Sequence, residues 1–363
     1  MRRVALKIVS VLMIVVLLTG CSSGILKGMK SAGDNIYVTR DSKYEKLAKL
    51  ASDSAREHGF RGTMIIATDE DIIMYCGQGS TDVNGKPVGP TTTYEIGSVS
   101  KMITATMTLM LIDQGKLSMD DKITKFFPEY VQAEDVTVAD LLHMQSGIPE
   151  YVNSKLYFFD KEDYTTMFEN DTMTDEIFLR CLYKHDLKFE PKTNTEYSNT
   201  NFHLLAMIIE QVEGESFGDV LKREIFDPCG MKHTSAMTVG DVTSVPGPLG
   251  YQAFQKGSRG AGDIHSCAED MIAFDRALFG GKLLSEGSLK LMTDFRGTFY
   301  GCGMKYINEN AYGHSGSTPA YISQSVIIET EEYGRVYFFA SATNYEGIQG
   351  FEVTMNAVIE ELS

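Results

Sequence analysis

The chain has 363 residues, of which 33 are Lys or Arg and 49 are Asp or Glu, so its formal charge is −16, and 43% of its residues are hydrophobic. This composition excludes a disordered or collagen-like chain, and the acidity argues against a nucleic-acid-binding protein, which needs a basic surface to neutralise phosphates. The length is sufficient for an enzyme built as one large domain or as two interleaved ones.

The N-terminal residues have the pattern of an export signal. Two arginines precede an apolar run over residues 8–18, and small residues follow up to Cys21. The run is shorter than the ~20 residues that span a bilayer, so residues 1–20 are predicted to be a secretory signal peptide. The ending Leu-Thr-Gly-Cys resembles the bacterial lipobox. This resemblance implies that Cys21 carries a lipid and anchors the chain at the extracytoplasmic face of the bacterial cell membrane.

The next residues lead into the predicted domain. Residues 21–41 mix Ser, Gly and charged residues without periodicity, so we expect a flexible tether there and a folded domain over residues 42–363. Apolar residues spaced by three and four predict a helix over residues 43–58. Two apolar runs within residues 63–76 flank the turn-forming pair Asp69-Glu70, which predicts a β-hairpin.

The helical period dominates the middle of the chain. The run from Ser98 to Gln114 is apolar nearly all round, which predicts a buried helix. A Thr-x-x-Asp capping box that ends at Asp140 predicts the start of another helix. Residues 152–191 are polar, aromatic and irregular, and they are a candidate lid or substrate wall. Further helices are predicted over residues 201–212, 217–226 and 268–279.

Strand patterns return near the C-terminus. Residues 321–329 and 335–342 are β-rich runs around a turn, and residues 351–362 are predicted to form a closing helix. Strands at both chain ends with helices between them predict an α/β (α+β) fold, in which an antiparallel sheet flanked by helices is built from both ends and carries an inserted all-helical domain. The sheet-bearing part is expected over about residues 42–97 and 292–363, and the helical part over about residues 98–291.

Cysteine and histidine spacing indicates neither a metal site nor a cofactor. The five cysteines other than Cys21 show no C-x-x-C spacing, and the seven histidines show no H-E-x-x-H and no pair one helical turn apart. These five cysteines are interpreted as small buried hydrophobic residues. We therefore expect no metal ion and no cofactor.

The first candidate for chemistry is a serine and a lysine at the start of the predicted buried helix. Ser98 and Lys101 are three residues apart and share one face of a helix. A serine hydroxyl needs a neighbouring base to become a good nucleophile, and a lysine can be that base when burial lowers its pKa. Ser98 is therefore a candidate nucleophile, with Lys101 as its base.

The second candidate is Tyr197-Ser-Asn199. A phenol can pass protons between a nucleophile and a leaving group, and an asparagine amide can hold both a lysine and a substrate carbonyl. Tyr151 and Tyr306 also begin a Tyr-x-Asn sequence. Tyr197 is preferred because it directly precedes a predicted helix, and Tyr151 is kept as an alternative.

The third candidate is Gly-His-Ser-Gly-Ser, which ends at Ser317 and leads into a predicted strand. Gly316 would let the backbone approach a ligand closely, so the N–H groups of Ser317 and Ser98 could form an oxyanion hole. His314 and Ser315 would then line the cleft. A Ser-His-Asp triad with Ser315 as nucleophile is an alternative, although the G-x-S-x-G elbow needs a glycine at position 317.

The three motifs in this order resemble the serine β-lactamase and penicillin-binding-protein superfamily, most closely its class C β-lactamase and D-alanyl-D-alanine carboxypeptidase branch. The resemblance covers most of the chain from about residue 60. It implies that Ser98 forms an acyl-enzyme, that Lys101 and Tyr197 move protons and that Asn199 orients the reactants. His314 stands where many β-lactamases have lysine, as in peptidase- and esterase-like members, and no Ser-Asp-Asn triplet is present.

The resemblance also implies the class of substrate. We expect a serine hydrolase that acts on D-amino-acid peptides, including peptidoglycan peptides, on β-lactams or on small esters, with the membrane as a partner through the lipid on Cys21 and with no nucleic acid. The alternative is a catalytically silent surface lipoprotein that binds cell-wall fragments or a partner. The sequence leaves the substrate and the oligomeric state open.

Overall fold

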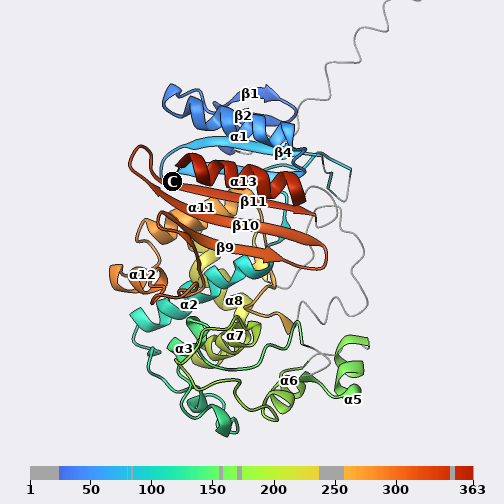
Figure 1. Ribbon diagram of the computed structural model, residues 1–363, viewed down its shortest axis with the longest axis vertical. Coiled ribbons are helices and arrows are strands. Elements are labelled where there is room, and N and C mark those ends of the chain that lie inside the picture. The colour runs from blue at the N-terminus through green and yellow to red at the C-terminus, as the bar shows by residue number, and fades with distance from the viewer. Residues whose placement is uncertain are drawn as a thin grey trace, which may run out of the picture.

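An eight-stranded antiparallel sheet joins the two ends of the chain. The computed structural model describes residues 24–79, 81–82, 85–154, 158–169, 174–236, 257–343 and 348–362. The strand order is β1-β2-β4-β3-β11-β10-β9-β8, so the pair β3–β11 connects the N-terminal strands to the C-terminal ones. Figure 1 shows the blue strands of the N-terminal part above the red strands β11, β10 and β9. This confirms the predicted sheet built from both chain ends. The strands are β1 (Lys30–Gly33), β2 (Ile36–Val38), β3 (Gly62–Thr68), β4 (Ile72–Gln78), β8 (Lys305–Asn308), β9 (Ala311–Ser317), β10 (Tyr321–Thr330) and β11 (Gly334–Thr343).

Helices cover both faces of this sheet. Helices α1 (Glu45–Glu57) and α13 (Ile348–Leu362) lie side by side on one face (Figure 1), and α11 (Ala268–Phe279) packs against β3 and β11 on the other. Because successive side chains of a strand point to opposite faces, Ile66 of β3 joins the core under α1 and α13, whereas its neighbour Ile65 joins the core shared with α11. The sheet is therefore buried on both sides near its middle.

The helical part is organised around α2 (Ser100–Asp113), which follows the 3-10 turn η3 (Gly97–Val99). Eleven of its 14 residues are buried, because it packs against α7 and α12 and beside β9. This confirms the predicted buried helix. The other helices are α3 (Val138–Leu142), α5 (Lys161–Tyr164), α6 (Asp175–Leu182), α7 (Asn199–Glu213), α8 (Phe217–Leu221), α9 (Asp227–Cys229) and α12 (Glu286–Met292), with π-helical turns at Thr165–Glu169 and Lys222–Phe226 and 3-10 turns at Gly24–Leu26, Ser42–Tyr44, Ile123–Lys125 and Val131–Ala133.

The expectation of an all-helical part is wrong in one respect, since residues 98–291 also contain strands. β6 (Ser235–Ala236) and β7 (Ile264–Ser266) form a small sheet with β5 (Tyr94–Glu95), in the order β5-β7-β6. Strands of two or three residues are too short to show the alternation on which sequence prediction relies. The small sheet leads directly into η3 and so helps to fix the start of α2.

The prediction of a flexible tether over residues 21–41 is wrong for Lys30–Gly33 and Ile36–Val38, which form strands. Strands β1 and β2 form a hairpin at the edge of the large sheet, and the side chain of Ile36 is fully buried there. Asp34 and Asn35 both adopt left-handed backbone angles (φ 51° and 55°) between the two strands, as a two-residue hairpin turn requires. The Asn35 amide also donates to the Gly77 carbonyl of the neighbouring strand (2.6 Å).

The predicted signal peptide and Cys21 lie outside the residues that the structure describes. Within the described ranges, none of the helices combines the length and the apolar character that are needed to cross a membrane.

Candidate active site

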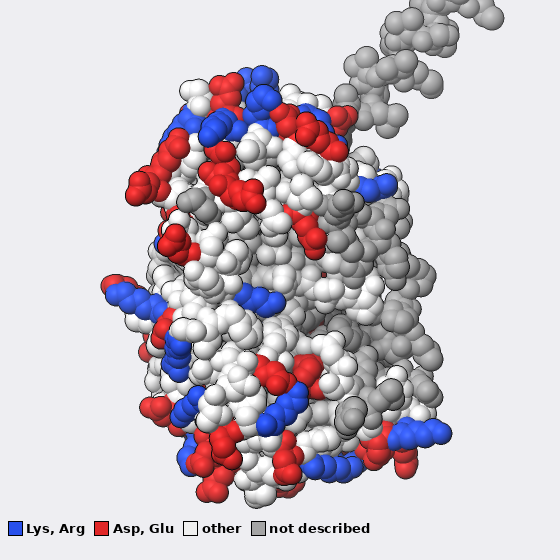
Figure 2. Space-filling view, in the orientation of Figure 1, with Lys and Arg blue, Asp and Glu red and all other residues white. Residues whose placement is uncertain are grey.

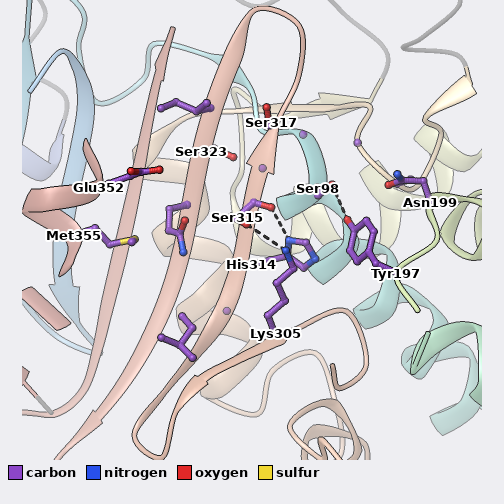
Figure 3. A pocket seen from close by; sticks show the side chains of 18 of the residues that line it. Ser98, Tyr197, Asn199, Lys305, His314, Ser315, Ser317, Ser323, Glu352 and Met355 are labelled. Carbon is purple, nitrogen blue, oxygen red and sulfur yellow. Dashed lines mark hydrogen bonds between the residues drawn. The ribbon is translucent and has the colours of Figure 1, made fainter. Parts of the chain in front are cut away.

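An open cleft of about 920 Å³ lies where the helical part meets β9 and β10. The space-filling view shows a hollow near the middle of the molecule, among mostly uncharged residues (Figure 2). The cleft extends from η3 and the start of α7 to β8, β9 and α13. Figure 3 shows side chains from these elements, which include Ser98, Tyr197, Asn199, Lys305, His314 and Ser315.

The Ser98 hydroxyl lies between two groups that can transfer protons. Ser98 is in η3, immediately before α2, and Lys101 is one turn further along the chain. The Lys101 Nζ lies 3.0 Å from Ser98 Oγ. The Tyr197 hydroxyl donates to the same oxygen at 2.9 Å (Figure 3). The structure thus brings together the three residues to which the sequence analysis gave the chemical steps.

Lys101 is fully buried and has three polar neighbours. Besides Ser98, its Nζ lies 2.7 Å from Asn199 Oδ1 and 2.6 Å from the Ala261 carbonyl oxygen. Burial holds the pKa of Lys101 well below its usual range, although the nearby Glu150 carboxylate opposes this shift. A lysine of this kind can release its proton far more readily than an exposed one.

Tyr197 remains a protonated phenol at neutral pH. Burial raises the pKa of its hydroxyl above the usual value. The Lys101 Nζ lies 5.0 Å from the centre of the Tyr197 ring, and the Lys305 Nζ lies 5.2 Å from it. Tyr197 can therefore act as a proton donor at Ser98, with two lysines near its ring.

Asn199 is the first residue of α7 and connects Lys101 to a buried carboxylate. Its Oδ1 faces Lys101, while its Nδ2 donates to Glu150 Oε1 at 3.1 Å. Its backbone N–H donates to the other oxygen of Glu150. Both ends of the Asn199 amide therefore have defined partners.

His314 of β9 is buried, and both of its ring nitrogens have partners. Nδ1 lies 2.7 Å from the Ser315 carbonyl oxygen, which can only accept, so Nδ1 carries the proton and Nε2 accepts from the Tyr300 hydroxyl at 3.0 Å. Burial holds the pKa of His314 well below its usual value, so the ring is neutral. This arrangement leaves no ring nitrogen to activate Ser315 Oγ and does not support the Ser-His-Asp alternative.

β9 runs directly against η3 at the two glycines that the contact requires. A Cβ atom at Gly316 would lie 2.0 Å from the Ile96 carbonyl oxygen, and one at Gly97 would lie 2.8 Å from the Ser317 nitrogen. The backbone of Ser317 is therefore close to the segment that carries Ser98. Because β8 pairs with β9 only over residues 311–313, residues 314–317 are not covered by that strand.

The other two Tyr-x-Asn tyrosines do not contact Ser98. Tyr151 is 1% exposed, and its hydroxyl lies 3.0 Å from Nδ1 of the buried His203. Tyr306 is 48% exposed on β8 at the rim of the cleft. Neither tyrosine therefore lies where it could transfer a proton to or from Ser98.

Comparison with known proteins identifies the family. The family model described as Beta-lactamase matches residues 47–349. The chain therefore belongs to the beta-lactamase family. Penicillin-binding protein 4* of Bacillus subtilis is 28% identical over 320 residues, which cover 79% of this chain and 69% of that protein. This family member is a serine hydrolase of the β-lactamase and penicillin-binding-protein superfamily.

Solved structures share the fold of this beta-lactamase family member. D-amino acid amidase from Ochrobactrum anthropi superposes with a TM-score of 0.69 at 24% identity, over 87% of this chain and 98% of that one. A D-stereospecific amidohydrolase from a Streptomyces species gives a TM-score of 0.67 at 23% identity, with the same two coverages. The large antiparallel sheet with its helices is thus the fold of these enzymes.

Two residues at this family member's site were not predicted from the sequence: Lys305, which lines the cleft, and the buried Glu150, which contacts Asn199. Lys305 lies on β8 and donates to Ser315 Oγ at 3.4 Å, and no carboxylate of the described residues is within ion-pairing distance of its Nζ. Burial lowers the pKa of Lys305. Neither residue belongs to a recognisable motif: the pairing of β8 with β9 brings Lys305 to the cleft, and the loop after α3 brings Glu150 to Asn199.

The described parts of the chain contain no group of three or more His, Cys, Asp or Glu side chains that is arranged to hold a metal ion. The absence of metal and cofactor stays a prediction from the sequence.

Proposed function

We propose that this chain cleaves an acyl bond through a covalent intermediate on Ser98. The observation that carries the proposal is the position of Ser98 Oγ, 3.0 Å from Lys101 Nζ and 2.9 Å from the Tyr197 hydroxyl at the edge of an open cleft. A neutral lysine amine has two N–H groups and one lone pair. Its two N–H groups would go to Asn199 Oδ1 and the Ala261 carbonyl, which leaves the lone pair for the proton of Ser98.

The reaction then proceeds in two acyl transfers. Ser98 Oγ attacks the carbonyl carbon as its proton passes to Lys101, and the N–H groups of Ser98 and Ser317 receive the developing oxyanion. The bond to the leaving group breaks as Tyr197 gives that group a proton and regains one from Lys101. Water attacks the acyl-serine by the reverse use of the same groups, which releases the acid and restores Ser98.

The position of Lys305 next to Ser315 supports a class of substrate, although Glu352 of α13 also lines the cleft. Lys305 places an ammonium beside Ser315, with no acidic partner among the described residues, so it favours a substrate with a carboxylate close to the scissile bond. D-amino-acid peptides and β-lactams have such a carboxylate, whereas small neutral esters do not. A similar protein named as a penicillin-binding protein supports this class, and a similar structure named as a D-amino acid amidase supports a D-amino acid on the acyl side of the scissile bond.

Intact-mass measurement of the purified full chain with benzylpenicillin tests the proposal. We expect the wild type and Ser315→Ala to gain the mass of one penicillin and Ser98→Ala to gain none. If neither benzylpenicillin nor D-alanyl-D-alanine peptides nor p-nitrophenyl esters were turned over or bound covalently, the catalytically silent binding protein would be the better account.

We further propose that residues 1–20 are removed and that Cys21 is lipidated, which places the domain on the extracytoplasmic face of a bacterial membrane. The residue pattern before Cys21 supports this. Labelling of expressing cells with radioactive palmitate should mark the wild type and not Cys21→Ser. Equal labelling of the two proteins would contradict the proposal.

A further inference from the structure

Glu150, in the loop that follows α3, has a carboxylate that is almost completely enclosed. The residue is 8% exposed. Its Oε1 accepts from Val152 N at 2.6 Å, Asn153 N at 3.2 Å and Asn199 Nδ2 at 3.1 Å, and its Oε2 accepts from the backbone N–H of Asn199. The carboxylate thus joins its own loop to the first residue of α7.

These bonds decide which way the Asn199 amide points. A carboxylate can only accept hydrogen bonds, so the amide must turn its NH2 group toward Glu150. Its oxygen is then directed to Lys101 Nζ, 2.7 Å away. If the amide were reversed, two donors would face each other at Lys101 and two acceptors at Glu150.

The charge of Glu150 also acts on Lys101 across this amide. Glu150 and Asp263 favour the charged form of Lys101, and burial and Lys305 favour the neutral form. The two neighbours with titratable rings, Tyr197 and His314, are both neutral. Of the charges that oppose the effect of burial on Lys101, Glu150 has the larger effect and Asp263 the smaller.

We propose that Glu150 is a positioning residue, which holds the Asn199 amide with its oxygen toward Lys101 and sets the pH at which Lys101 becomes a base. The proposal rests on the proposed role of Lys101, but it concerns a residue outside the three motifs. Glu150 does not line the cleft and need not touch the substrate.

The test measures Lys101 directly and through acylation. In protein labelled with 13C at lysine Cε, the Lys101 signal is assigned by its absence from Lys101→Arg, and its titration is followed by NMR. We expect Glu150→Gln to lower the midpoint by about one pH unit, because an opposing charge is lost. The pH at which the rate of benzylpenicillin acylation reaches half of its plateau should shift by the same amount. The plateau rate itself should fall by roughly tenfold to a hundredfold, because the Asn199 amide is no longer held in one orientation.

Two further variants distinguish the effect of the Glu150 charge on Lys101 from the effect of Glu150 on the orientation of the Asn199 amide. Glu150→Asp keeps the charge but shortens the reach, so the midpoint should stay near that of the wild type while the plateau falls. Glu329→Gln is the matched control, since Glu329 pairs with Arg335 (2.8 Å) at the end of β10 away from the cleft. Glu329→Gln should change neither the titration midpoint of Lys101 nor the plateau rate of acylation.

An unchanged Lys101 midpoint in Glu150→Gln would overturn the proposal. If Glu150→Gln did not fold, an unchanged plateau in Glu150→Asp would do so. A shifted midpoint in a protein that benzylpenicillin never acylates would leave the assignment of Glu150 intact and count against the proposed function instead.

Discussion

Lys101 is the residue on which the proposed chemistry depends, because its buried Nζ lies within hydrogen-bond distance of Ser98 Oγ. Replacing it by methionine keeps the approximate volume and removes the base. We predict that Lys101→Met lowers the rate of benzylpenicillin acylation by about 10²–10⁴-fold, the usual contribution of a general base. Stopped-flow or intact-mass kinetics of the two proteins measure this loss. A variant that is acylated within threefold of the wild type would contradict the role.

The same substitution tests the burial of Lys101 through stability. Because the pKa of Lys101 is lowered in the folded protein, the unfolded state binds more protons between that pKa and the usual 10.5, and the free energy of unfolding rises with pH in this window. The burial of Lys101 therefore lowers the free energy of unfolding of the wild type most at low pH. Thermal unfolding from pH 6 to 10 should show Lys101→Met more stable than the wild type, by a margin that shrinks as the pH rises.

Lys305 is predicted to act on the carboxylate of the substrate. In Lys305→Gln the hydrogen bond to Ser315 can be kept, but the charge is lost. The specificity constant for benzylpenicillin should fall by about tenfold or more, since hydrogen bonds between charged groups contribute about 1.5–3 kcal/mol. Hydrolysis of a neutral p-nitrophenyl ester should change by less than twofold. Equal losses on both substrates would indicate a structural role.

At the scale of elements, the contact of β9 with η3 holds the cleft together. Gly316→Ala would place a methyl group 2.0 Å from the Ile96 carbonyl oxygen, so one of the two backbones must move. We expect a loss of about 1–3 kcal/mol in unfolding free energy, typical of overpacking, together with loss of acylation. Chemical denaturation checks this result. Gly287→Ala in α12, where a Cβ would meet nothing closer than 3.8 Å, is the control and should be neutral or slightly stabilising.

Long elements could be predicted from the sequence, and short ones could not. α11 occupies the predicted residues 268–279, and the strands β10 and β11 lie within one or two residues of their predicted bounds. The hairpin β1–β2 was missed because its strands have four and three residues, too few for a periodic pattern. The sequence signal for this hairpin was the residue pair Asp34-Asn35, because Asp and Asn tolerate the left-handed backbone angles that such a turn requires.

Some residues of the site could be predicted from a local sequence pattern, and others are brought together only by the fold. Ser98 and Lys101 meet because they lie one helical turn apart, and this spacing is visible in the sequence. Glu150 and Lys305 reach the same place through the loop after α3 and through the pairing of β8 with β9. No local pattern encodes those approaches, so the sequence offered no reason to select these two residues.

At the scale of the whole molecule, the charge of −16 opposes the approach of an anionic substrate. Salt screens this long-range repulsion, since the Debye length falls from about 30 Å at 0.01 M to about 8 Å at 0.15 M. The second-order rate of benzylpenicillin acylation should therefore rise by up to about threefold over this range, while hydrolysis of a neutral ester stays constant. A falling rate would show that the local field of Lys305 outweighs the net charge.

The most direct test of the central claim is to locate the acyl group. The full chain is incubated with benzylpenicillin and digested, and its peptides are sequenced by mass spectrometry. The account predicts a single modified residue, Ser98, and no modified peptide in Ser98→Ala. A penicilloyl group on Ser315 or on any other residue of the wild type, or an adduct that persists in Ser98→Ala, would contradict it.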